Sequence, residues 1–141
     1  MRKLLYLCLL FAFSCTEDFV LDQNQILNDD LQNIEKSLQA ALKVCNSEAM
    51  PWLSEMLQKA EEDRLYQEHM GQYTGYISVV QYKKEIYFYT TFPMGSGGIY
   101  AYIFDCNGIR QQSLPEEQLT YFHKTARNRN LVIYSTIDFK N

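Results

Sequence analysis

The spacing of apolar residues changes along the chain, and this change constrains the fold more than any other feature. Over 27–45 the apolar residues recur every three or four positions, which is the spacing of one helix face. A second run of this kind covers 51–68 and begins with a proline, which suits a first helical turn. The segments 73–82 and 86–92 are instead rich in aromatic and β-branched residues, and they predict a β-hairpin.

The second half of the chain continues this alternation. We expect a third strand over 99–104, a tight turn at 105–108 that contains glycine, and a fourth strand over 109–112. Capping-box spacing of Ser113 and Glu116 predicts the start of a helix that ends at Asn128 or Asn130, and 131–137 predicts a last strand. The order ααββββαβ indicates an α+β domain, in which an antiparallel sheet of four to five strands packs by one face against two to three helices.

The first fifteen residues indicate where the chain is sent. Arg2 and Lys3 precede an uncharged apolar run over 4–13, and Ser14 places a small residue directly before Cys15. This pattern defines a secretory signal, and its apolar run is too short to span a bilayer. A cysteine just after the cut resembles the lipobox of bacterial lipoproteins, which implies that the Cys15 thiol is diacylated and its amine acylated. An ordinary secreted protein is the alternative.

This interpretation divides the chain into a signal peptide (1–14), a lipidated cysteine with an acidic tether (15–28) and a single globular domain (29–141). Without Arg2 and Lys3, eleven basic residues stand against seventeen acidic ones, a net charge of −6. This balance argues against binding to nucleic acid and against electrostatic adhesion to anionic lipid. Membrane attachment is therefore expected to come from the N-terminal lipid anchor.

Three residues after Cys15 bear on the final location of the protein. Glu17 and Asp18 resemble the acidic surface-export signal of Bacteroidetes-type lipoproteins, and the alternative is an acidic, solvated linker. In enterobacteria, aspartate directly after the lipidated cysteine marks retention in the inner membrane. Because this position is Thr16, the analogy favours the outer membrane, at its periplasmic side or at the cell surface.

Two cysteines remain in the mature domain once Cys8 is removed and Cys15 is lipidated. Cys45 closes the apolar face of the first helix, and Cys106 lies in the predicted tight turn. In an oxidising compartment a disulfide between them is the default, and it is worth ~4 kcal/mol in the chain-entropy treatment. Two buried free thiols are the alternative. Neither Cys-x-x-Cys nor His-x-x-x-His spacing occurs to complete a metal site, so none is expected.

A longer resemblance extends from Cys45 to about Arg110. It rests on Cys45, on the Pro-Trp-Leu of 51–53 that opens a helix, on the hairpin sequence QYKKEIY of 81–87 and on YIFDCNG of 102–108. These features resemble a family of small exported lipoprotein domains of Bacteroidetes that have no assigned activity. Family members often carry extra cysteines after the second strand, where this chain has Pro-Met-Gly-Ser. The resemblance implies export and the fold, and it implies no catalytic residue.

Recognised catalytic patterns are missing from the sequence. The loop 95–98 joins two strands without a following lysine, so it is not a P-loop, and Ser96 lacks a G-x-S-x-G context. His123 is expected to be a hydrogen-bonded core residue on the apolar face of its helix. A nucleophilic Cys106–His123 pair is excluded if Cys106 is oxidised. We therefore expect neither an enzyme nor a cofactor.

Tyrosine is concentrated in the predicted strands, where seven of the eleven lie between residues 73 and 102. Tyr87 and Tyr89 are expected on the same side of one strand, and Tyr100 and Tyr102 on the same side of the next. The opposite sides of these strands hold mainly aliphatic residues. If the aliphatic side faces the helices, these four tyrosines form an exposed band that binds an envelope protein or a carbohydrate. The alternative is cross-strand pairing that supports a half-exposed sheet.

The sequence favours a non-catalytic binding or accessory module held at the cell envelope. One alternative is a structural or stress lipoprotein whose 27–45 stripe joins an assembly, although that stripe lasts for fewer than three heptads. The other is a small envelope hydrolase, which would need an open cleft holding histidine or paired carboxylates.

The lipobox makes a direct prediction for Cys15→Ser. Because the acyl chains attach to this thiol, the variant should remain unprocessed or become soluble in the periplasm, as read by fractionation and acyl labelling. A variant that stays with the membranes and is still labelled would show that the lipoprotein interpretation is wrong.

Overall fold

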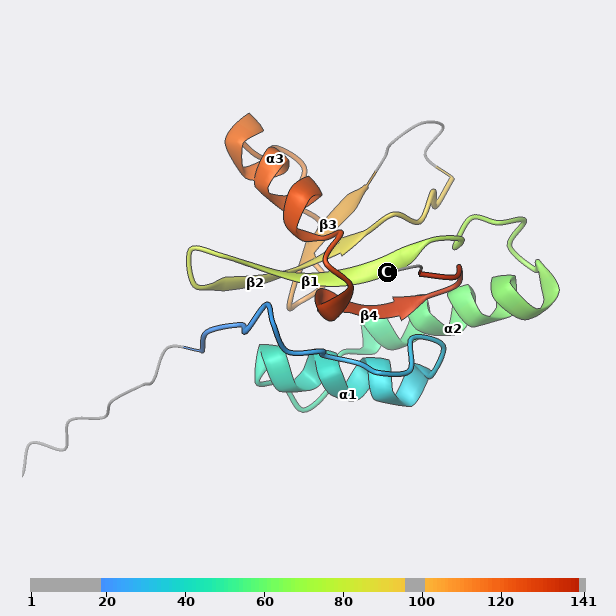
Figure 1. The fold of residues 1–141 in the computed structure, drawn as a ribbon. Coiled ribbons are helices and arrows are strands. Elements are labelled where there is room, and N and C mark those ends of the chain that lie inside the picture. The colour runs from blue at the N-terminus through green and yellow to red at the C-terminus, as the bar shows by residue number, and fades with distance from the viewer. Residues whose placement is uncertain (1–18, 96–100, 140–141) are drawn as a thin grey trace, which may run out of the picture.

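The computed structural model describes residues 19–95 and 101–139. In this part of the chain, helices pack on both sides of a four-stranded antiparallel sheet (Figure 1), so the predicted α+β class is confirmed. The elements in chain order are α1 (Ile34–Cys45), α2 (Pro51–Tyr66), β1 (Tyr76–Tyr82), β2 (Glu85–Thr90), β3 (Tyr102–Asp105), α3 (Glu116–Thr125), the short 3-10 helix η1 (Arg129–Leu131) and β4 (Val132–Ser135).

The sheet has the strand order β3-β2-β1-β4, and all its neighbours are antiparallel. The strand expected over 109–112 is reduced to an isolated bridge between Phe104 and Arg110. The reason is the Asp105 side chain, whose Oδ1 accepts the backbone N–H groups of Asn107 and Ile109, each at 2.9 Å. A side chain that binds these amides competes with a regular ladder and closes the turn instead.

The first helix begins at Ile34, seven residues later than the start of the apolar stripe. Asn33 caps it, because its side chain accepts the N–H of Lys36 at 3.0 Å. Residues before the cap are held by other contacts: the buried Asn28 amide donates to the Ile133 carbonyl at 2.7 Å, and Leu21 lies in the core. The folded domain therefore includes residues that precede the expected boundary at 29.

The sequence had predicted that the helices cover one face of the sheet. This prediction is wrong, because the three helices are divided between the two faces. The core on one face packs against α1 and α2 and includes Ile77, Val79 and Phe88. A second core on the other face joins Val80 of β1 to Phe122 of α3, which lies across that face in Figure 1. Four consecutive buried residues in β1 reflect this arrangement, because a strand covered on both faces loses the alternation of buried and exposed side chains.

The predicted disulfide between Cys45 and Cys106 is confirmed, with a Cα–Cα distance of 5.8 Å. Trp52, at the start of α2, lies over the same turn and donates from Nε1 to the Cys106 carbonyl at 3.2 Å. Gly108 is required beneath this ring, since its φ is +78° and a Cβ there would lie 2.5 Å from Trp52 Cγ. The disulfide thus joins the end of α1 to the turn after β3, and the Trp52 contact joins the start of α2 to the same turn.

Removing the disulfide should destabilise the domain substantially. Replacing Cys45 and Cys106 together with alanine is expected to lower the free energy of unfolding by ~4 kcal/mol, because the reduced chain regains loop entropy. Urea unfolding of the two proteins measures this difference. Two titratable thiols in denatured, oxidised protein that lacks Cys15 would contradict the assignment.

Candidate functional site

Two of the four tyrosines proposed as an exposed band are buried. Tyr89 and Tyr102 are only 5% and 6% exposed, Tyr87 is half-buried, and Tyr100 lies outside the described residues. Burial raises the pKa of Tyr89 to about 12, and burial together with Glu85 raises that of Tyr87 to about 12. These are hydroxyls held among other side chains, so the exposed-band hypothesis is wrong for Tyr89 and Tyr102.

The pairing of β2 with β3 explains why the alternation of residues along each strand gave the wrong face for Tyr102. Tyr89 pairs with Ile103, and Thr90 pairs with Tyr102. Directly paired residues point to the same face, so Tyr102 lies on the face opposite to Tyr87 and Tyr89. Tyr102 stacks against Phe104 there, while Tyr87 and Tyr89 lie beneath α3.

His123 is exposed, although its place on the helix had predicted a core residue. Its Nδ1 lies 2.7 Å from the hydroxyl of Tyr89, and the two rings meet edge to face. This pair fastens the exposed side of α3 to β2. Hydrogen bonds between tyrosine and histidine are common in purely structural roles. Neither Tyr89 nor His123 lines any of the hollows found in the described residues, so the pair does not face a cavity that could hold a substrate.

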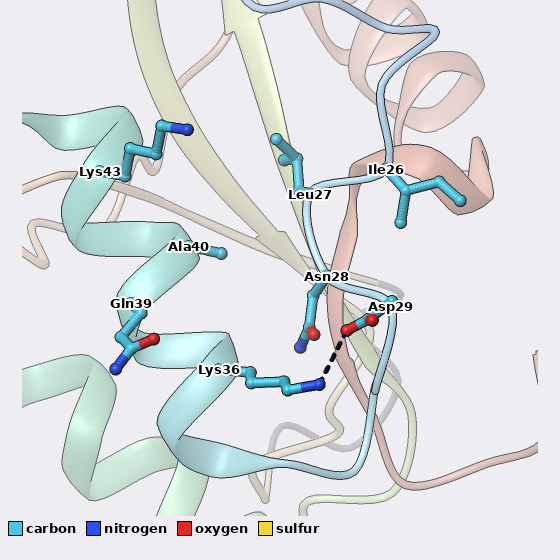
Figure 2. A pocket seen from close by; sticks show the side chains of 8 residues that line it. All are labelled: Ile26, Leu27, Asn28, Asp29, Lys36, Gln39, Ala40 and Lys43. Atoms are coloured by element: carbon cyan, nitrogen blue, oxygen red, sulfur yellow. Dashed lines mark hydrogen bonds and ion pairs between the residues drawn. The ribbon is translucent and has the colours of Figure 1, made fainter.

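A hollow of about 410 Å³ forms an open groove between residues 26–29 and α1 (Figure 2). Lys36 reaches across it to Asp29, with Nζ 3.0 Å from the carboxylate, and each group shifts the other's pKa toward the charged form. Both side chains are well exposed, so the pair contributes little to stability. Gln39, Ala40 and Lys43 of α1 also line this groove.

The strongest candidate site is at the other end of the domain, in the loop that follows α2. We call residues 67–75 the Asp63 loop, because this loop closes over the carboxylate of Asp63. Asp63 is 4% exposed, and it accepts the backbone N–H groups of His69 at 2.8 Å, Gly71 at 3.2 Å and Tyr73 at 2.8 Å. A single buried side chain therefore determines the path of the loop.

Electrostatics at Asp63 favours its charged form. Burial by itself would raise the pKa of Asp63, but the three backbone donors outweigh it and hold the pKa below its ordinary value. The carboxylate accepts three N–H groups of the loop, so its role is to hold the backbone.

The backbone of this loop is strained as well as braced. Gln67 and Met70 both have φ of +54°, a left-handed conformation that costs about 1 kcal/mol or more for residues other than glycine. Gly71, at +78°, adopts it without that cost. Strained residues persist where the surroundings determine them fully, and they gather at binding and catalytic sites.

The strained backbone displays apolar side chains to solvent. Tyr66, the last residue of α2, is 74% exposed, Met70 is 85% exposed and the neighbouring Leu65 is 51% exposed. The three lie within six positions of one another in the sequence, and Met70 lines a hollow of about 400 Å³. Aromatic side chains and methionine are enriched at protein interfaces, so this end of the domain can bind a protein surface.

The wall of this hollow is anchored in the core. Arg64, which lines it, donates from Nε to Glu61 at 2.8 Å, and the hydroxyl of the fully buried Tyr134 donates to the same carboxylate oxygen at 2.8 Å. Arg64, and to a lesser extent Tyr134, lower the pKa of Glu61, while burial first and Glu61 second raise that of Tyr134. The Arg64 guanidinium is thus held in one position by Glu61.

Comparison of the chain with protein-family models, with curated proteins and with solved structures found no match. Within residues 19–95 and 101–139, no group of three or more histidine, cysteine or acidic side chains is placed to hold a metal ion. In the same residues, no helix has the length and hydropathy needed to cross a membrane.

The sequence analysis missed the Asp63 loop because the loop is held by bonds from backbone N–H groups, which no side-chain pattern reveals. Asp63 stands among acidic residues on α2, which resemble any solvated helix face. The available clue was the pair of a buried-face aspartate and a glycine eight residues later, since aspartate often accepts the amides of a following turn.

Replacing Asp63 with asparagine should loosen the loop. The amide leaves backbone donors unsatisfied, so we expect a loss of about 1–3 kcal/mol in the free energy of unfolding at pH 7, whereas Glu48→Gln at an exposed position should change little. Because folding lowers the pKa of Asp63, its contribution is present above the unfolded value of 3.8 and is lost as the pH falls through the folded value. Urea unfolding from pH 7 to pH 3 should therefore show the two curves converging, and a constant gap would contradict the assignment.

Proposed function

We propose that the protein is a cell-envelope lipoprotein whose domain is a non-catalytic binding or accessory module. The Asp63 loop, together with Tyr66 at the end of α2, is its contact surface for a protein partner in the envelope. The observation that carries this proposal is the combination of a buried brace, a left-handed backbone and exposed Tyr66 and Met70 in one short segment. A loop that is rigid before binding loses little conformational entropy when a partner docks.

The position of the loop suits a tethered module. β1 begins at Tyr76, directly after the Asp63 loop, and its seven residues span about 20 Å. Its far end lies beside Phe19, the first described residue after the lipobox, because the Gln81 amide donates to the Phe19 carbonyl at 2.7 Å. Figure 1 shows the loop and the start of the described chain at opposite ends of the domain. A lipid on Cys15 would therefore leave the loop facing away from the membrane.

The two alternatives receive less support from the geometry. A structural role through α1 needs its apolar face to be open, but Ala41 and Val44 on that face are buried in the domain's own core. A hydrolase would draw on the Tyr89–His123 pair, which fastens α3 to the sheet. The outer membrane remains the location that Thr16 favours.

The test compares two forms of the lipidated protein, recovered from envelope membranes after chemical cross-linking. Tyr66→Ser combined with Met70→Ser should reduce a discrete cross-linked partner at least tenfold, because the apolar contact is lost. The melting temperature should change little, since both side chains are exposed. Ile109→Ser is the matched control, as Ile109 is 60% exposed and lies outside the loop.

Equal cross-linking by wild type and by the double variant would overturn the assignment of the loop. Loss of the partner with Ile109→Ser as well would place the contact elsewhere on the surface.

A further inference from the structure

The end of the domain opposite the Asp63 loop brings apolar and basic side chains together. Phe19 and Val20 are 45% and 77% exposed. Lys83 and Lys84, both exposed, form the turn between β1 and β2. Figure 1 shows this turn and the start of the described chain at the same end of the molecule.

Gln81 fixes the apolar pair close to the basic turn. Its Nε2 donates to the Phe19 carbonyl at 2.7 Å, and its Oε1 accepts the N–H of Leu21 at 2.6 Å. The Leu21 side chain is buried in the core. The backbone from Phe19 to Leu21 is therefore held beside Gln81, which lies two residues before the turn.

The turn itself has an unusual sequence for its geometry. Tyr82 pairs with Glu85, so two residues connect the strands, and both are left-handed, with φ of 47° at Lys83 and 70° at Lys84. Asn-Gly or a similar pair is strongly favoured in such a turn. Two lysines are strained there, and a strained residue at an exposed position indicates a role beyond folding.

The reach of the chain places this end against a bilayer. Only four residue steps separate Cys15 from Phe19. At most ~3.5 Å per residue, they span no more than about 14 Å. This argument rests on the lipidation proposed above, which puts Cys15 at the membrane surface.

We propose that this end is a membrane-docking surface, in which Phe19 and Val20 enter the headgroup region and the ammonium groups of Lys83 and Lys84 contact lipid phosphates. Glu17, Asp18, Asp22 and Glu85 outnumber the two lysines, so this end has no net attraction to an anionic bilayer. The contact is therefore short-range and needs the anchor to bring it to the surface. Docking at two places would fix the orientation of the domain. The Asp63 loop would then point away from the bilayer.

The experiment uses the full lipidated protein in vesicles of phosphatidylethanolamine and phosphatidylglycerol. A bimane fluorophore is attached at Val20→Cys, at Lys83→Cys or, as a control at the far end, at Glu68→Cys. Nitroxide-labelled lipid should quench positions 20 and 83 at least threefold more than position 68. The mass of each protein is measured first, so that loss of the lipid, which would overturn the anchor and the docking surface together, is distinguished from failure of docking alone.

Equal quenching at all three positions of a lipidated protein would overturn the docking surface while leaving the anchor intact. A spectral shift at position 20 that requires an envelope protein and no lipid would also overturn it. A variant with Lys83→Asn and Lys84→Gly separates folding from docking. It removes the strain and both charges, so it should raise the melting temperature and yet lower the quenching at position 20 at least twofold; unchanged quenching would remove the lysines from the proposal.

Discussion

The covalent link between Cys45 and Cys106 is the constraint on which the rest of the structure depends. It joins the end of α1 to the turn after β3, and Trp52 covers that turn from the start of α2. The helical pair is thereby held at one end against the sheet. Because α2 runs from this fixed point to the Asp63 loop, the covalent link and the packing of Leu53 and Leu57 together determine where the loop is presented.

The chain stores backbone strain at both ends of β1. Gln67 and Met70 precede the strand, Lys83 and Lys84 follow it, and all four are left-handed. Such residues cost stability, and a well-packed sheet covered on both faces offsets that cost. The Asp63 carboxylate holds one end, and the Gln81 amide holds the N-terminal segment at the other. Under the two proposals above, the domain is a rigid spacer with a functional surface at each end.

Residue spacing predicts the helices, most of the strands and the disulfide, because helical and strand periods and the inward position of Cys45 are local properties. It does not predict which face α3 covers, since one strand of Ile-Ser-Val-Val can be buried on both sides. It fails for Tyr102 because parity within a strand carries no information on register between strands. It also misses the Asp63 loop, where one carboxylate organises amides up to ten positions away.

We propose above that a loop held rigid by Asp63 is directed away from a lipid anchor toward a protein partner. The most direct test places a photo-crosslinking amino acid at position 66 or 70 in living cells, with the exposed position 112 as the reference. We expect one discrete adduct of the same partner from positions 66 and 70, and none from position 112. Adducts of equal intensity from all three positions, or an adduct from position 112 alone, would contradict it.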